Sequence, residues 1–282
     1  MNIFKDTMSE MTYEQIEKSV EQESIVLFPV GIIEEHGPHL PLGTDIYLAY
    51  KQAHDVWEEL NELGIPCVIA PPFYLGGVQA LTRHFPGTFA FRKETIMACI
   101  EEYLENLDRF GFKRVVVFND HGDGLHISAI VEAIKNANRK LELQAYWMEY
   151  AYELKEHGFS GEEDYILKLT DMPFEEMFQI SKEPRDAFDV HAGGFETATM
   201  REIYPEAVRE DALAGLEPTF LQGEQISKWC NGAAEDKALI PNGYVGDPKG
   251  SQYIKTNLKE ADRRIAMDIV NSFGKRVNDN YE

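Results

Sequence analysis

Three side chains that commonly bind metal ions, Glu34, His36 and Asp45, lie within the fifteen-residue segment GIIEEHGPHLPLGTD of this chain. The segment is rich in Gly and Pro and follows an apolar run at 25–30. In an extended chain, residues two positions apart point to the same side, so Glu34 and His36 can reach one locus. Gly and Pro favour the turn that would return Asp45 to that locus. The segment therefore predicts part of a metal site.

A second pair of possible ligands follows another apolar run, at 115–118. The segment NDHGD, residues 119–123, places His121 and Asp123 at the same spacing of two. A lone His or Asp in a loop is usually a cap or turn residue, but the clustering of five such residues at two strand ends favours ligands. Two imidazoles and three carboxylates suit Zn²⁺, Mn²⁺ or Fe²⁺ rather than Ca²⁺. Because one catalytic zinc normally takes three protein ligands, five ligands fit a two-ion site with a bridging carboxylate.

A third segment, HAGGFET at residues 191–197, could supply an acid or base. His191 titrates near neutrality, which makes it a candidate proton shuttle. The paired glycines that follow allow the backbone to approach another group closely. Glu196 is either a further carboxylate of the site or a residue of a first helical turn, where the helix dipole favours negative charge.

Alternating strands and helices must position these groups. Apolar runs predict strands at 25–30, 67–70, 115–118 and 143–147, and helical spacing predicts helices at 13–22, 45–63, 96–110, 125–134 and 258–277. This alternation predicts an α/β fold with a mostly parallel sheet covered on both faces. Ligands of such sheets bind beyond the carboxyl ends of the strands, where both His-acid pairs fall.

We expect a single domain over residues 1–282, with one irregular, acidic insertion at about 152–188. That insertion is longer than an ordinary connection of about 4–6 residues. It is interpreted as a lid, an oligomer contact or a solvated excursion, and the sequence leaves these alternatives open.

The formal charge of −22 argues against a nucleic-acid partner and against anionic membrane surfaces, because both need clustered Lys and Arg. No stretch approaches the roughly 18 apolar residues of a membrane helix, and the first residues do not resemble a secretory signal. Three widely spaced cysteines favour reduced thiols over a disulfide framework. We expect a cytoplasmic protein that acts on a small molecule.

Five segments together resemble the creatininase family of metal-dependent hydrolases. They are GIIEEHGPHLPLGTD, HFPGT, VVVFNDHGD, HAGGFET and GYVGDP, and they occur in the expected order from about Val26 to Asp247. The resemblance implies a three-layer α/β/α sandwich with a mostly parallel central sheet. It also implies two divalent ions per subunit, Zn²⁺ or Mn²⁺ with Fe²⁺ as an alternative, and a homo-oligomer, for which a hexamer is favoured.

The resemblance also implies a role for each candidate residue. One ion would be bound by Glu34, Asp45 and His121, and the other by His36, Asp45 and Asp123, with Asp45 as the bridge. His191 would be the acid or base near the substrate, and Glu196 lies in the family's Glu-Thr pair. Glu35 and His39 fill positions that orient ligands and loop.

The chain departs from creatininase itself at several of these positions. Asp123 stands where that enzyme has Glu, and is one methylene shorter. Asp120 replaces a Gly, Gly122 stands where creatininase has Tyr, and Ala187 stands where it has Trp. Without those aromatic walls, creatinine is not the expected substrate. Other residues are expected to line the substrate pocket: Trp147, which matches a family aromatic, His84 and Gly122.

The expected function is hydrolysis of the C–N bond of an amide or lactam in a small, polar, cyclic substrate. A metal-bound hydroxide would attack the carbonyl, and His191 would relay the proton to the leaving group. Two alternatives remain open. One is C–C ring opening of a keto-inositol such as 3-dehydro-scyllo-inosose, and the other is a metal-binding or assembly protein without turnover.

Overall fold

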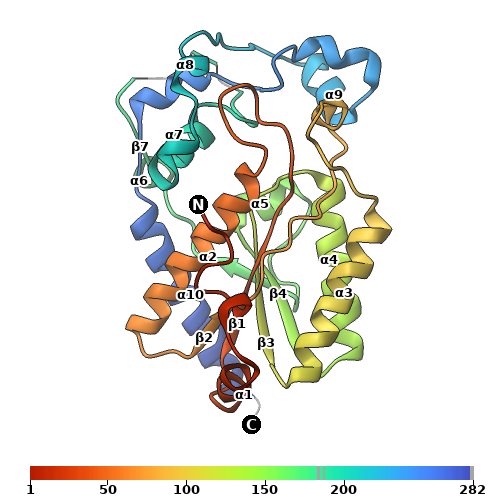
Figure 1. Cartoon of the computed structure of the whole chain (residues 1–282), viewed down its shortest axis with the longest axis vertical. Helices are drawn as coiled ribbons and strands as arrows, with labels where there is room; N and C mark the ends of the chain where they lie inside the picture. The colour runs from red at the N-terminus through yellow and green to blue at the C-terminus, as the bar shows by residue number, and fades with distance from the viewer. Residues whose placement is uncertain (183–184, 187, 280–282) are drawn as a thin grey trace.

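Five parallel strands form the central sheet in the order β2-β1-β3-β4-β5 (Figure 1). The computed structural model of the chain describes residues 1–182, 185–186 and 188–279. The strands are β1 (Ile25–Val30), β2 (Cys67–Ile69), β3 (Arg114–Asn119), β4 (Gln144–Tyr150) and β5 (Ile166–Leu169). The four strands predicted from the sequence are all present, and β5 is a fifth.

Side chains of successive residues in these strands enter two different hydrophobic cores. Val26 and Phe28 of β1 belong to one core, and Ile25 and Leu27 belong to the other. All six residues of β1 are buried. This explains why the run reads as continuously apolar, since a parallel sheet covered on both faces offers no solvent-facing positions.

Helices cover both faces of the sheet. Helices α3 (Lys93–Phe110) and α4 (Gly124–Lys140) lie on one side, and α2 (Thr44–Glu62) and α10 (Leu258–Asp279) on the other (Figure 1). The fold is therefore the predicted three-layer α/β/α arrangement with a mostly parallel sheet. Helix α1 (Tyr13–Glu21) begins with a capping box in which Thr12 and Gln15 bond each other's backbone amides.

Shorter elements complete the chain. They are the helices α5 (Ala151–Glu156), α6 (Phe174–Met177), α7 (Gly194–Ile203), α8 (Glu210–Leu213) and α9 (Glu224–Asn231), the 3₁₀ helices η1 (Met8–Glu10), η2 (Leu81–His84), η3 (Pro205–Ala207), η4 (Ala234–Leu239) and η5 (Pro248–Tyr253), and the antiparallel pair β6 (Phe178–Ile180) and β7 (Ile254–Thr256). Figure 1 places α7, α8 and α9 above the central sheet, so the chain builds a second tier over it.

The segment expected to be an irregular insertion at 152–188 is more ordered than its composition indicated. It supplies β5 at the edge of the sheet, where Ile166, Leu167 and Leu169 are buried, and then α6 and β6. The strand was missed because its few apolar residues stand among acidic ones, and pairing with β4 rather than local pattern makes it a strand.

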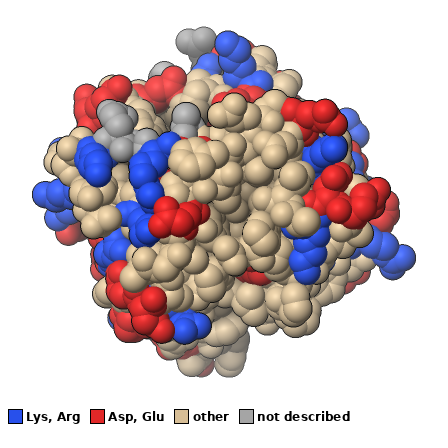
Figure 2. Space-filling model, turned by 90° about the horizontal axis from the view of Figure 1, so that it is seen from above, with Lys and Arg blue, Asp and Glu red and all other residues tan. Residues whose placement is uncertain are grey.

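No helix in the described ranges is long and apolar enough to cross a membrane. Seen from above, Lys and Arg alternate with Asp and Glu around the edge of the molecule, and the centre of this face carries mostly uncharged residues (Figure 2). The acidic surplus is therefore not concentrated on this face.

Candidate metal centre

The end of β1 lies against the first turn of α2. A Cβ at Gly31 would lie 3.0 Å from the backbone nitrogen of Ile46, so only glycine permits this approach. The amide of Glu34 donates to the carbonyl of Leu42 at 2.8 Å and closes the intervening loop. Asp45 stands in the first turn of α2, where the helix dipole favours a carboxylate. The N-cap is Gly43, which leaves the Asp45 side chain free to face the site.

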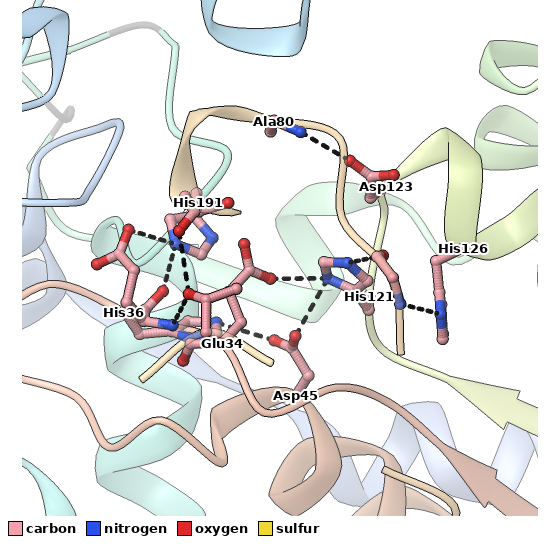
Figure 3. A network of polar contacts seen from close by, with 12 residues as sticks. Glu34, His36, Asp45, Ala80, His121, Asp123, His126 and His191 are labelled. Atoms are coloured by element: carbon pink, nitrogen blue, oxygen red, sulfur yellow. Dashed lines mark hydrogen bonds and ion pairs between the residues drawn. The ribbon is translucent and has the colours of Figure 1, made fainter. Parts of the chain in front are cut away.

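Glu34, Asp45 and His121 form the first group of possible ligands. Nδ1 of His121 lies 3.2 Å from Oε2 of Glu34 and 3.1 Å from Oδ2 of Asp45 (Figure 3). Nε2 of His121 lies 3.1 Å from the carbonyl of Gly77 and must donate its proton there. Nδ1 of the neutral ring therefore carries the lone pair, which is the form that binds a metal ion.

His36, His191 and Glu196 form the second group, with one possible ligand atom from each within 4.8 Å of the others. Nδ1 of His36 donates to the carbonyl of Glu34 at 2.9 Å. Its Nε2 lies 2.9 Å from Oδ1 of Asp45 and 3.3 Å from Oε1 of Glu196. His191 follows the same pattern, because its Nε2 donates to the carbonyl of Glu35 at 2.8 Å and leaves Nδ1 with a lone pair.

These residues fit a pair of divalent cations. Oε2 of Glu34 and Oδ2 of Asp45 are buried, and within the described structure neither accepts a hydrogen bond. Burial disfavours the charged form of His121, yet the nearby carboxylates of Glu34 and Asp45 raise its pKa to about 9. Converging carboxylates thus favour a positive charge at this position, which a divalent ion would supply, and imidazole with carboxylate suits transition metals.

Asp123, expected to be the second ion's ligand, lies outside both groups. Its oxygens accept from the amides of Leu125 at 2.9 Å, Gln79 at 2.8 Å and Ala80 at 3.2 Å, and it is the N-cap of α4. Figure 3 shows this carboxylate directed toward Ala80, away from Glu34 and Asp45. The short Asp side chain is a preferred N-cap. Its oxygens therefore bind backbone amides at the start of α4 and at residues 79 and 80, and they do not face the candidate metal centre. Glu196 brings the carboxylate next to His36 instead.

The three residues expected to bind substrate have different outcomes. Trp147 is fully buried in the core on the α3 and α4 side, where it packs on Phe159 at 5.3 Å between ring centroids, and it does not line the cavity beside the centre. Nε2 of His84 lies 2.8 Å from the carbonyl of Gly232, so His84 ties η2 to the segment after α9. Gly122 does line the cavity, and a Cβ there would meet nothing within 4 Å. Ala187 falls outside the described residues.

The backbone around His191 is held by Asp189, which the sequence did not single out. Asp189 accepts from the amide of Gly194 at 2.7 Å and from that of Asp247 at 3.0 Å. A Cβ at Gly193 would lie 2.0 Å from Oδ1 of Asp189. These contacts join the segments HAGGFET and GYVGDP, and they explain why the glycines stand where they do.

A cavity of about 380 Å³ opens beside the centre, and His121, His191 and Glu196 form part of its wall. Further acidic residues line it that the sequence analysis did not assign to the pocket: Asp120, Glu149, Glu153 and Asp262. Glu149 stands near the carboxyl end of β4. Ligands of parallel sheets bind beyond the carboxyl ends of the strands, so its position in the sequence could have predicted its place in the pocket. Asp262 lies on α10, far along the chain, and no local signal marks it.

Known proteins resemble the chain in both sequence and structure. The Creatininase family model, described as creatinine amidohydrolase, matches residues 9–257. Creatinine amidohydrolase of Pseudomonas putida is 26% identical over 218 residues, which cover 75% of this chain and 76% of that protein. Mycofactocin precursor peptide peptidase of Mycolicibacterium smegmatis is 28% identical over 257 residues, covering 90% and 84%. The solved structure named Creatininase Mn superposes with a TM-score of 0.67 at 21% identity, over 96% of this chain and 98% of that chain.

The family match identifies the chain as a metal-dependent hydrolase, and the two groups of candidate ligands are consistent with that class. The chain belongs to the creatininase family. The expectation of an enzyme is thereby confirmed, and the alternative of a metal-binding protein without turnover loses its support.

Proposed function

We propose that the protein is a binuclear amidohydrolase that cleaves the C–N bond of an amide or lactam in a small polar substrate. The observation that carries this proposal is the position of Asp45, whose Oδ1 lies 2.9 Å from His36 and whose Oδ2 lies 3.1 Å from His121. A carboxylate with one oxygen toward each group suits a bridge between two ions. We assign the first ion to Glu34, Asp45 and His121, and the second to His36, Asp45 and Glu196.

Divalent ions held there would polarise a carbonyl oxygen and lower the pKa of a water molecule. We assign the proton transfer to Nδ1 of His191, because Nε2 is committed to the carbonyl of Glu35. His191 also lines the cavity, so a leaving nitrogen bound there can be protonated by it. Glu35 supports this placement, since its carboxylate accepts from the amide of Gly37 at 3.0 Å and its own amide donates to Thr88 at 3.0 Å.

Ring opening of a keto-inositol is the second candidate. A relative from Thermotoga maritima named 3-dehydro-scyllo-inosose hydrolase is 24% identical over 227 residues, covering 78% of this chain and 64% of that protein. The same ligands serve addition of water to a ketone, and the two reactions differ in whether an amine is released. Creatinine is not the proposed substrate, since Gly122 leaves that part of the cavity wall open.

The test combines metal analysis of the purified protein with a substrate screen in the same metal. Zn²⁺ and Mn²⁺ are the first ions to load, with Fe²⁺ under anaerobic conditions, since all three accept these ligands. The screen contains lactams, linear amides, formamides, creatinine and keto-inositols. Two ions per chain with amine release from one amide class would support the proposal. Carboxylate formation without amine release would favour the keto-inositol reaction, and a single ion without turnover would contradict both.

The family resemblance also supports a homo-oligomer, with a hexamer favoured. Exposed aromatic side chains, among them Phe174 at 47% and Phe220 at 52% exposure, offer apolar surface for such contacts. Light scattering coupled to size-exclusion chromatography tests this, and a monomer at micromolar concentration would contradict it.

A further inference from the structure

Six carboxylates line the cavity without belonging to either group of candidate metal ligands, and four of them are left when Asp55, paired with Lys51, and Asp189, bound by backbone amides, are set aside. These four come from separate parts of the chain: Asp120 follows β3, Glu149 is in β4, Glu153 in α5 and Asp262 in α10. An acidic run on one exposed helix face would be a solvated surface. These four carboxylates come from different parts of the fold, and they all face the same cavity.

Asp262 is the most informative of the four. It is 4% exposed, no hydrogen bond or ion pair joins its carboxyl group to another described residue, and Lys51 is the cation whose charge acts on it. A buried carboxyl group without a hydrogen-bond partner is costly in either protonation state, so proteins seldom keep one without a use. Because Asp262 lines the cavity, a group that enters the cavity can supply a partner.

The cavity has little positive charge of its own outside the metal centre. Lys51 is the one Lys or Arg among the described residues that line it. Its ammonium group already forms an ion pair with Asp55, one helical turn away. Asp189 is likewise occupied by backbone amides. Outside the metal centre, the remaining carboxyl groups therefore face little positive charge, and Lys51 is the cation whose charge acts on Asp262.

The pKa values of two of these carboxyl groups, Glu149 and Asp262, are raised in this environment. Burial, together with the nearby charges of Glu153 and Asp120, raises the pKa of Glu149 to about 8. Burial and the charge of Asp55 raise the pKa of Asp262 to about 8. A ligand that brings a positive charge into the cavity would favour the ionised form of both.

We propose that this cavity selects substrates that carry a positively charged nitrogen, an ammonium or guanidinium group, in addition to the bond that is hydrolysed. That the substrate contains an amide bond depends on the function proposed above. That it carries a positive charge depends on the four carboxylates. The charged group lies against Glu149 and Asp262, and the amide reaches His121, His191 and Glu196 on the same cavity wall.

The remaining wall suits an aliphatic stem between the two ends. Met148, Leu169, Phe178 and Phe195 contribute apolar surface, and the rings of Phe178 and Phe195 lie 5.0 Å apart. Aromatic faces also attract cations. A neutral polyol would hydrogen-bond to the carboxyl groups without favouring their ionised form, whereas a cation gains a charge pair, so a cationic substrate is favoured over a sugar-like one.

The first experiment is calorimetric binding to the metal-loaded protein at constant ionic strength. The probes are pentylamine and butylguanidine as cations and pentanol as their neutral counterpart. We expect both cations to bind about tenfold or more tightly than pentanol, since a buried charge pair adds at least this much. The two cations separate ammonium from guanidinium recognition. Equal affinity for cations and pentanol would overturn the inference without any variant.

The second experiment replaces the carboxylates by amides of the same shape. Asp262→Asn and Glu149→Gln should weaken the binding of the preferred cation about tenfold and leave pentanol unchanged. Glu62→Gln is the matched control, because Glu62 is exposed at the end of α2 and does not line the cavity. Folding of each variant is checked by circular dichroism. Folded variants that bind the cation as the wild type does would overturn the inference.

The third experiment separates this inference from the proposed function. N-acetylputrescine, N-pentylacetamide and 4-acetamidobutanoate carry the same amide with a positive, neutral or negative end. We expect hydrolysis with the lowest KM for N-acetylputrescine, and a higher KM at near-constant kcat in Asp262→Asn. Hydrolysis without charge preference would overturn the inference and leave the hydrolase function standing. Selective binding of cations without hydrolysis of any amide would support the charge selection and contradict the proposed amidohydrolase function.

Discussion

Asp123 follows His121 by two residues, yet the two side chains serve different parts of the molecule. Nδ1 of His121 faces Glu34 and Asp45, while the carboxylate of Asp123 caps α4 and accepts from amides at 79 and 80 (Figure 3). The i, i+2 rule holds only while the chain stays extended, and here a helix begins at Gly124. The carboxylate that lies beside His36 is therefore Glu196, in a distant segment, and we propose it as the ligand of the second ion.

Asp123→Ala should keep the metal content of the wild type and lower stability. Loss of an N-cap costs about 1 kcal/mol, and the amides of Gln79 and Ala80 also lose their acceptor. Metal analysis and thermal unfolding measure the two effects. Glu196→Gln is the complementary variant and should lose one ion while keeping the stability of α4. The reverse pattern, with one ion lost from Asp123→Ala, would restore Asp123 as a ligand.

Asp45→Ala should remove both ions and all hydrolase activity, because each carboxylate oxygen faces a different group of ligands. Glu34→Gln should affect the first ion only. Inductively coupled plasma mass spectrometry after dialysis gives the ions per chain. Asp45→Ala protein that retains one ion would show that Asp45 is not shared.

His191→Ala should leave metal content near that of the wild type and slow turnover by about 100-fold to 10,000-fold, the usual contribution of a general acid or base. His191 also lies in a group of possible ligands with His36 and Glu196, so metal content is the deciding measurement. If the variant loses an ion, His191 is a ligand and the proton carrier must be sought elsewhere.

Gly193→Ala should destabilise the protein by about 2 kcal/mol or more and reduce activity. The added Cβ would lie 2.0 Å from Oδ1 of Asp189, which holds the amides of Gly194 and Asp247. Gly122→Ala is the matched control, since a Cβ there meets nothing within 4 Å. Thermal unfolding compares the two. Equal melting temperatures for both variants would contradict the positioning role of Asp189.

Asp262→Asn should stabilise the protein more at pH 9 than at pH 5. Folded Asp262 keeps its proton up to a pKa of about 8, because of burial and the charge of Asp55, whereas an unfolded Asp releases it at a pKa of about 4. Between these values the folded state binds more protons, so rising pH costs the wild type stability that the Asn variant keeps. Melting temperatures from pH 4 to pH 9 test this. A constant difference across that range would contradict it.

The sequence by itself determined the sheet, its covering helices and most of the candidate metal centre. Apolar runs such as 25–30 and 115–118 predict buried strands regardless of partner, and Glu34, His36, Asp45 and His121 stand at the ends of such strands or just beyond. Groups at the carboxyl ends of neighbouring parallel strands converge because the sheet has one common edge. Local pattern was therefore sufficient for these residues.

Only the tertiary structure decided which carboxylate completes the second group and what surrounds the centre. Asp123 and Glu196 are equally capable ligands in isolation, and the helix cap on one and the contact of the other with His36 distinguish them. Trp147 has a side chain suited to a pocket, but strand alternation directs it into the core. Asp262 meets Asp120 and Glu149 in one cavity only because α10 packs across α2. Such placements depend on contacts between distant elements, and no local periodicity encodes them.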